Sequence, residues 1–289
     1  MQPLHLFMLD TTDPASEPVR LDPTTAVVRA DDLGVTRGDG IFETIAVIKG
    51  VPQAVVAHLD RFDRSAAMLD LEIPDRNQWL HAVEVAAAAL ADVEGAAAIK
   101  TVLTRGVEGS GVPTAWALAF KADDPATPRA EGISVVSLDR GYKHDVAETS
   151  PWLLQGAKSL AYAINKASLR EAARRGADDV LYVSSDDYVL EGPSSTVIAR
   201  IDGVYVTPPT TLGILPGTTM WDVFSILEAR GERTEVRELR PADLESADAL
   251  WLCSSTRGAA PVRTLDEKDY PVDHALSDEI NAGLDARTK

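Results

Sequence analysis

The stretch that organises this chain runs from Gln155 to Gly192 and reads QGAKSLAYAINKASLREAARRGADDVLYVSSDDYVLEG. It opens with Lys158, just before an apolar-periodic run that predicts a helix, and it closes with Glu191 at the end of a short strand pattern. A glycine-containing turn separates the two elements, so the segment can fold an amine and a carboxylate into one pocket. Some catalytic sites combine a lysine that forms an imine with a carboxylate that stays ionised. Taken singly, each residue also fits a solvated position at the end of its element.

The composition bounds the class of protein. A length of 289 residues predicts two domains or one large domain, and 45% apolar residues are enough for a full core. A formal charge of −17 argues against general binding of nucleic acid, because no basic surplus is present to displace counterions. The single cysteine, Cys253, fits a reducing compartment. Residues 1–20 lack the pattern of a signal peptide, and no apolar run of 18 residues occurs, so we expect a cytoplasmic protein without a membrane segment.

The periodic patterns predict two domains. Residues 1–120 read as an α+β unit, residues 121–131 (KADDPATPRAE) as a Pro-rich charged linker, and residues 132–289 as an α/β unit. A two-residue turn at Asp202-Gly203 predicts a hairpin. The predicted strands are 41–48, 51–56, 96–104, 115–120, 133–138, 196–201, 203–207, 235–239 and 249–253, and the predicted helices are 58–71, 78–92, 220–230, 241–246 and 275–286.

Several short stretches could bind an anion. LPGTT (215–219) places a Gly-Thr-Thr turn at a helix start, where backbone N–H groups and hydroxyls suit a phosphate, although the threonines could equally cap the helix. SSTRG (254–258) is a second cluster of donors after a buried-looking strand, and Arg61 lies on a predicted helix. The five histidines are scattered without ligand spacing, so we expect no metal site.

Together these stretches match a known pattern. In order along the chain they are RGDGIFET (37–44), HLDRFDRSA (58–66), KSLAY (158–162), EAARRGADDVLYV (171–183), VLEGPSSTV (189–197), TPP (207–209), GILPGTT (213–219) and LCSST (252–256). On these marks, from about Arg29 to Leu265, the chain resembles the class IV aminotransferase family, the fold-type IV pyridoxal-phosphate enzymes. The order and number of the marks make the resemblance specific, whereas none of them would be specific alone.

The resemblance implies a fold like that of D-amino acid aminotransferase, with a smaller N-terminal α+β domain, a larger C-terminal α/β domain, and pyridoxal 5'-phosphate in the interdomain cleft. It implies that Lys158 links covalently to the cofactor and acts as the catalytic base, and that Glu191 pairs with the pyridine nitrogen. Tyr162 would lie near the phenolic oxygen of the cofactor. The phosphate would be bound by Arg61, Thr218, Thr219 and Thr256. Ala161 departs from the family, which often has asparagine before this tyrosine.

The resemblance leaves the reaction open. The loop VEGSGVPT (107–114) lacks the arginine and histidine by which D-amino-acid aminotransferases hold a substrate carboxylate, and its glycines look more like the 4-amino-4-deoxychorismate lyase group. That reaction, elimination of pyruvate to give p-aminobenzoate for folate synthesis, is therefore favoured. The alternatives are an aminotransferase of the branched-chain or D-amino acid type and a non-catalytic phosphate-ligand binding protein. Substrate candidates are Arg37, Phe42, Arg105 and Arg257. Family members are usually homodimers, so we expect one here.

Overall fold

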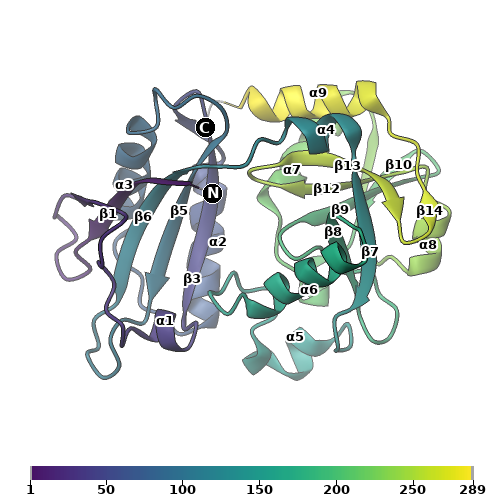
Figure 1. Ribbon diagram of the computed structural model, residues 1–289. Coiled ribbons are helices and arrows are strands. Elements are labelled where there is room, and N and C mark those ends of the chain that lie inside the picture. Colours follow the sequence, from purple (N-terminus) through teal and green to yellow (C-terminus); the bar gives the residue numbers. More distant parts are fainter. Residues whose placement is uncertain (1, 288–289) are drawn as a thin grey trace. The chain divides into compact units, whose positions relative to one another are not determined.

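The computed structural model describes residues 2–287, which form two compact units (Figure 1). The first unit contains residues 2–124 together with the short segment Ala157–Tyr162 and Arg287. The second contains Pro125–Gly156 and Ala163–Ala286. The chain therefore returns to the first unit in the middle of the second.

The first unit is built on an antiparallel sheet of six strands in the order β2-β1-β6-β5-β3-β4. Its elements are β1 (Gln2–Leu9), β2 (Val19–Leu21), α1 (Leu33–Thr36), β3 (Gly40–Ile48), β4 (Val51–Pro52), α2 (Val55–Met68), α3 (Arg76–Ala88), β5 (Ala97–Thr104) and β6 (Thr114–Lys121).

One face of this sheet packs against α2 and α3. Alternation along β3 places Ile41 and Ile45, both fully buried, on this face. The helices are joined to each other by an edge-to-face contact of Phe62 with Trp79, whose ring centroids lie 4.9 Å apart. Asp75, a residue type typical of helix starts, caps α3, since its side chain accepts a hydrogen bond from the backbone N–H of Asn77.

The second unit is built on a curled sheet of eight strands, with β11-β10-β9-β12-β13-β7-β8 in order and β14 paired with β13. Its strands are β7 (Ile133–Asp139), β8 (Asp179–Val183), β9 (Thr196–Ile201), β10 (Val204–Thr207), β11 (Arg233–Val236), β12 (Ala249–Ser254), β13 (Gly258–Leu265) and β14 (Lys268–Asp269). Its helices are α4 (Ala126–Glu131), α5 (Val146–Thr149), η1 (Pro151–Leu153), α6 (Ala163–Arg174), η2 (Thr210–Leu212), α7 (Thr218–Ala229), α8 (Pro241–Glu245) and α9 (His274–Asp285).

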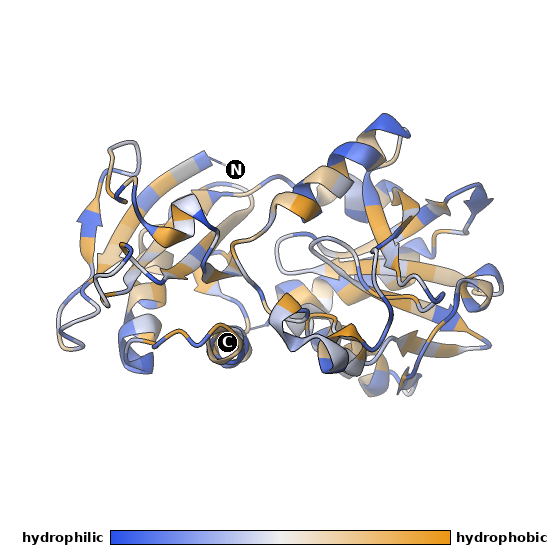
Figure 2. Cartoon of the chain, turned by 90° about the horizontal axis from the view of Figure 1, so that it is seen from below, coloured by the Kyte–Doolittle hydropathy of each residue, from blue (hydrophilic) through white to orange (hydrophobic). Residues whose placement is uncertain are grey.

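The second unit buries its apolar residues in three clusters. One lies among the strands and includes Leu239 and, on α8, Leu244. Another packs α7 and α9 on the sheet around Trp251, and the third lies under α6 around Tyr182. Figure 2 shows the same pattern, with hydrophobic colour along the strands and hydrophilic colour at turns and outer helix faces.

The structure differs from the predicted boundaries at several elements, including the linker and one strand of the first unit. Residues 126–131, inside the predicted linker, form α4, whose Arg129 donates to the carbonyl oxygen of Arg257 and pairs with Asp285. These partners are distant in sequence, so the local pattern could not reveal them. The predicted strand 51–56 is also wrong beyond Pro52, because α2 begins at Val55.

No helix within residues 2–287 has both the length and the apolar character needed to cross a bilayer. The cytoplasmic location remains a prediction from the sequence.

Asp32 precedes the motif RGDGIFET and links the turn before β3 to the neighbouring strands β5 and β6. Its fully buried carboxylate accepts hydrogen bonds from the hydroxyls of Thr104 and Thr114, at the ends of β5 and β6, and from the backbone N–H of Gly34. The adjacent Leu33 N–H donates to the carbonyl oxygen of Gly106. This residue therefore fixes the turn before β3 to the loop between β5 and β6.

We expect the substitution Asp32→Ala to lower the free energy of unfolding by about 2–4 kcal/mol, because two buried hydroxyls and a backbone N–H lose their acceptor. The matched control is Asp31→Ala, whose exposed carboxylate pairs with Arg29 and should contribute within about 0.5 kcal/mol. Urea unfolding of both variants measures the difference. Equal stabilities of the two variants would contradict this role of Asp32.

Candidate active site

Backbone pairing places Lys158 in the first unit. The N–H of Phe42 donates to the carbonyl oxygen of Lys158 over 3.0 Å, and the N–H of Leu160 donates to the carbonyl oxygen of Gly40 over 2.8 Å. Ile41 and Ser159 form the antiparallel bridge between these two bonds. Residues 158–160 thus extend the edge of β3 that β5 does not occupy.

Gly40 lies where β3 is closely approached from both sides. A Cβ at this position would lie 2.6 Å from the carbonyl oxygen of Leu103 on β5 and 2.8 Å from the end of the Leu160 side chain. The Leu160 side chain could rotate away, but the carbonyl oxygen is part of the sheet backbone, so a side chain at residue 40 would disturb the pairing of β3 with β5. The glycine in the motif RGDGIFET therefore keeps β3 in register at the point where the lysine segment pairs with it.

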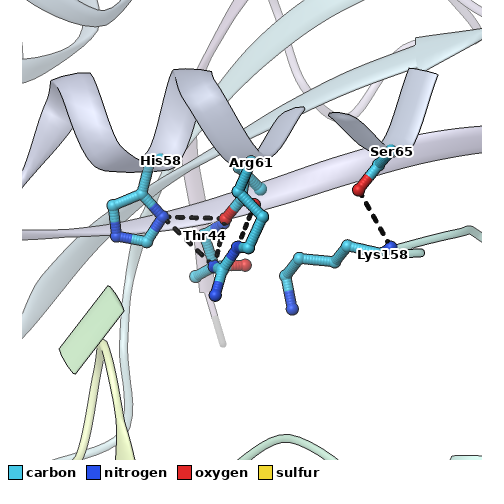
Figure 3. Close-up of polar contacts among 6 residues, drawn as sticks. Thr44, His58, Arg61, Ser65 and Lys158 are labelled. Carbon is cyan, nitrogen blue, oxygen red and sulfur yellow. Dashed lines mark hydrogen bonds and ion pairs between the residues drawn. The ribbon is translucent and has the colours of Figure 1, made fainter. Parts of the chain in front are cut away.

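Arg61 lies in a buried cluster with two residues to which sequence reasoning gave no role (Figure 3). The carboxylate of Glu43, on β3, accepts from Arg61 Nε over 2.6 Å and from Arg61 Nη2 over 2.7 Å. The same carboxylate is 2.7 Å from Nδ1 of His58, one turn before Arg61 on α2. The exposed fractions are 0% for Glu43, 1% for His58 and 4% for Arg61, so all three groups are shielded from water.

Burial and charge set the protonation of this cluster. Burial opposes ionisation of Glu43, but the Arg61 guanidinium and the His58 hydrogen bond outweigh it and hold the pKa of this carboxyl well below its usual value. Burial lowers the pKa of His58, and the positive charges of Arg61 and Lys158 add to that effect against the opposing pull of Glu43. His58 is therefore neutral near pH 7, and its Nδ1–H donates to Glu43.

The same face of α2 continues to the lysine. Ser65 lies one turn after Arg61, and its Oγ accepts the backbone N–H of Lys158 over 3.1 Å. Figure 3 shows the Arg61 and Lys158 side chains on the same side of α2. The Lys158 Nζ lies 4.6 Å from the ring centroid of Phe42, and the ring of Tyr162 meets that of Phe42 edge-to-face at 5.5 Å. Four of the predicted site residues are thus brought together in the first unit: Phe42, Arg61, Lys158 and Tyr162.

Glu191 belongs to a second group, in the second unit. Its backbone pairs with Tyr182 of β8, and its Oε2 accepts the N–H of Leu215 over 3.1 Å. This bond connects the half-buried carboxylate to the turn that starts α7. Tyr142 lies within electrostatic range, and burial together with the Glu191 charge raises the pKa of its phenol to about 12, although Arg140 opposes the shift.

The segments that carry the predicted phosphate-binding threonines both adjoin the start of β9. A Cβ on Gly217 would collide with the Thr196 hydroxyl, so the glycine lets the first turn of α7, with the buried Thr218 and Thr219, approach this strand. Thr196 is also paired with Cys253, next to the hairpin turn 255–257 that carries Thr256. A helix N-terminus offers amide hydrogens and partial positive charge to an anion.

The arginines named as substrate candidates differ in their surroundings. Arg37 is exposed, and Arg105 pairs with Asp39 and donates to the carbonyl oxygens of Leu69 and Asp70. Arg257 pairs with the buried Asp179 over 2.7 Å. We infer that Arg105 and Arg257 have structural roles, since these contacts hold each guanidinium to its own unit.

Sequence reasoning missed Glu43 and His58, although a signal was present. Glu43 alternates with Ile41 and Ile45 on the buried face of β3, and a carboxylate in the middle of such a face needs a cationic partner. Arg61 and His58 lie one turn apart on the next long helix, which is the spacing that such a partner and a second donor require.

Comparison with known proteins identifies the family. The sequence model described as amino-transferase class IV matches residues 40–265. The chain belongs to the class IV aminotransferase family. It is 43% identical to a bifunctional aminodeoxychorismate lyase / D-amino acid transaminase of Mycobacterium tuberculosis, over 87% of this chain and 90% of that protein.

Solved structures agree with this membership. A fold IV transaminase of Curtobacterium pusillum has a TM-score of 0.95 and 52% identity over 98% of this chain and 99% of that one. A hypothetical aminotransferase of M. tuberculosis, solved with pyridoxal phosphate, has a TM-score of 0.91 and 39% identity over 97% of this chain and 99% of that one. The predicted family, fold class and cofactor are confirmed, and the protein is a pyridoxal-phosphate-dependent enzyme of class IV.

The donor set fits the cofactor. Lys158 carries the amine that an aldehyde requires, Arg61 is a buried cation suited to phosphate, and Glu191 is a carboxylate suited to a pyridinium N–H. The backbone of each of these side chains is held in place by strand pairing or by its helix.

The buried neutral His58 predicts a loss of stability in mild acid. In the unfolded chain His58 takes up a proton below about pH 6.5, whereas in the folded protein it stays neutral, so the unfolded state binds more protons. The contribution is present above pH 6.5 and is lost as the pH falls, with a slope of at most about 1.4 kcal/mol per pH unit.

We therefore expect His58→Gln to flatten the dependence of unfolding free energy on pH between about 7.5 and 5.5, measured by urea unfolding. His81→Gln is the control, because His81 lies on the surface, where it pairs with Glu17. An unchanged slope in the His58 variant would contradict the assignment.

Proposed function

We propose that the enzyme is a 4-amino-4-deoxychorismate lyase that eliminates pyruvate and releases p-aminobenzoate, a precursor in folate synthesis. The observation that carries the proposal is the anchoring of Lys158 beside Arg61 by its pairing with β3. The choice of reaction is supported by the loop 107–114, which has no arginine or histidine. It is also supported by the lyase activity in the name of the mycobacterial relative.

The chain's own residues would divide the chemistry among them. Pyridoxal phosphate, when bound, supplies a ring that accepts electrons from the substrate Cα. Lys158 would supply the amine that holds the cofactor aldehyde and the base that accepts the substrate Cα proton. Glu191 would keep the pyridine nitrogen protonated, with its carboxylate fixed by the Leu215 N–H. The phosphate would be held by Arg61, Thr218, Thr219 and Thr256. Tyr162 would act near the phenolic oxygen, and Arg37 and Phe42 would contact the substrate.

Transamination of amino acids is the second candidate. The Curtobacterium protein is named a transaminase, and the mycobacterial relative carries D-amino acid transaminase in its name. Both reactions begin with removal of the Cα proton by the same lysine, so one set of residues would serve either reaction. The residues outside that set, in 37–44 and 105–114, would decide which substrate is accepted.

We also propose that the enzyme is a cytoplasmic homodimer. Strand register places Met8, Val19 and Trp116 on one face of the first sheet, and Leu21 and Leu118 on the same face. Val19 is 58% exposed and Leu21 36% exposed. An apolar surface of this kind is typical of a protein interface, which supports association with a second copy.

The role of Lys158 is tested by trapping. Borohydride reduction of the enzyme with pyridoxal phosphate should attach the cofactor mass to the peptide that contains Lys158, as read by mass spectrometry. Lys158→Ala should lose this label and at least about 10²–10⁴-fold of the rate, because both the covalent link and the base are removed. Lys166→Ala, which alters an exposed lysine on α6, should keep both. A label that persists in the Lys158 variant would exclude this lysine.

The reaction is tested by product. The enzyme incubated with aminodeoxychorismate and no 2-oxo acid should release pyruvate and p-aminobenzoate in equal amounts, measured by a coupled dehydrogenase assay and by chromatography. Absence of pyruvate, together with conversion of the cofactor absorbance to its amine form by D-alanine or isoleucine, would reject the lyase in favour of transamination.

A further inference from the structure

The proposed mechanism gives a role to Arg61 but none to Glu43 and His58, the two residues that contact it in the buried cluster. The carboxylate of Glu43 accepts two hydrogen bonds from one edge of the Arg61 guanidinium, from Nε over 2.6 Å and from Nη2 over 2.7 Å. This is the fork geometry in which a guanidinium and a carboxylate make two parallel charge-assisted bonds. It commits one edge of the guanidinium to the protein and fixes the plane of the group.

We propose that Glu43 is a positioning residue, which holds the guanidinium of Arg61 so that its remaining N–H groups face the phosphate of the cofactor. The inference rests on the proposed function, in which Arg61 binds that phosphate. His58 assists by donating Nδ1–H to the same carboxylate and so fixes the rotamer of Glu43.

The need for such a clamp follows from the side chain itself. An arginine has four rotatable bonds, and confining them is unfavourable by about 2 kcal/mol of side-chain entropy if it occurs only when the ligand binds. Glu43 confines them beforehand, because it comes from the neighbouring β3 and not from the helix that carries Arg61. Preorganisation of this kind raises affinity for the ligand without adding a contact to it.

The charges of the cluster also support a positioning role for Glu43. With Glu43 ionised and His58 neutral, Arg61 and Glu43 together carry no net charge. Without the carboxylate, the buried guanidinium would lose this compensating anion and would be less stable in its buried position. Glu43 therefore keeps the cation in place while the cofactor is absent.

The test compares two ligands that differ only in the phosphate. Apoprotein, prepared by removal of the cofactor with cysteine and dialysis, is titrated with pyridoxal phosphate and with pyridoxal. Protein fluorescence gives each Kd. When a residue that hydrogen-bonds to a ligand-binding side chain is substituted, the ligand typically binds roughly 10–100-fold more weakly. We expect Glu43→Gln to weaken pyridoxal phosphate by this factor and pyridoxal by less than about twofold. Glu43→Asp, which keeps the charge but shortens the reach, should give an intermediate ratio.

Thr101→Val is the matched control. Thr101 is the cross-strand neighbour of Glu43, is fully buried, and has no hydrogen-bond partner for its hydroxyl among the residues described. The change disturbs the same place in the sheet without touching the clamp, so the ratio of the two Kd values should stay that of the wild type. Thermal unfolding of all variants separates a local effect from a loss of fold.

Two outcomes would overturn the inference. One is that Glu43→Gln and Glu43→Asp leave the preference for the phosphorylated ligand unchanged while Arg61→Lys reduces it. The other is that the Glu43 variants weaken both ligands equally. If Arg61→Lys itself leaves the preference intact, Arg61 is not the phosphate ligand, and the proposed function fails at that residue independently of Glu43.

Discussion

The hydrogen-bonded pairing of residues 158–160 with residues 40–42 is the constraint on which the rest of the candidate site depends. It bonds the backbones of Lys158 and Leu160 to β3, and the Ser65 hydroxyl on α2 accepts the N–H of Lys158. The lysine is therefore held by a sheet edge and a helix, and not by the loop in which its sequence neighbours lie. A covalent link between protein and cofactor needs such a fixed origin, because a displacement of about 1 Å at a reacting group can reduce a rate by about 100-fold.

The first unit also contains a buried ionic cluster to which both a strand and a helix contribute. β3 contributes the anion and α2 the cation and the imidazole, and each fills a position that would otherwise be occupied by an aliphatic side chain. Ionic groups in a core are weak evidence for stability, since an apolar replacement of similar volume is often no less stable. Their presence here is better explained by the proposed role of Arg61 in binding an anion. Ile41 and Ile45 on either side of Glu43 supply the packing that the charged groups do not.

Much of the fold was predictable from the sequence. The strands β3, β5 and β6, the Asp75 cap and the hairpin at Asp202-Gly203 follow from local patterns, and the structure has them. The short helices α1, α4 and α5 were not predicted, because tertiary contacts stabilise them and local periodicity does not. The family motifs indicated Arg61, Lys158 and Glu191 as site residues. The grouping of Lys158 with α2 was not predictable from local pattern, since it depends on a pairing between segments far apart in the chain. The ion pairs of Arg105 with Asp39 and of Arg257 with Asp179 also join residues far apart in the sequence, so local pattern could not predict them.

The return of the chain to the first unit has a consequence for synthesis on the ribosome. The first unit has all of its own strands once Asp124 has been made, but the edge of β3 at residues 40–42 stays unpaired until the segment ending at Tyr162 emerges, about 38 residues later. At typical elongation rates this interval lasts roughly 2–8 s. During it the nascent sheet exposes an edge with unsatisfied backbone groups, which is the kind of surface that neighbouring chains can pair with. Lys158, the proposed catalytic lysine, is thus also part of the segment that pairs with this edge of β3.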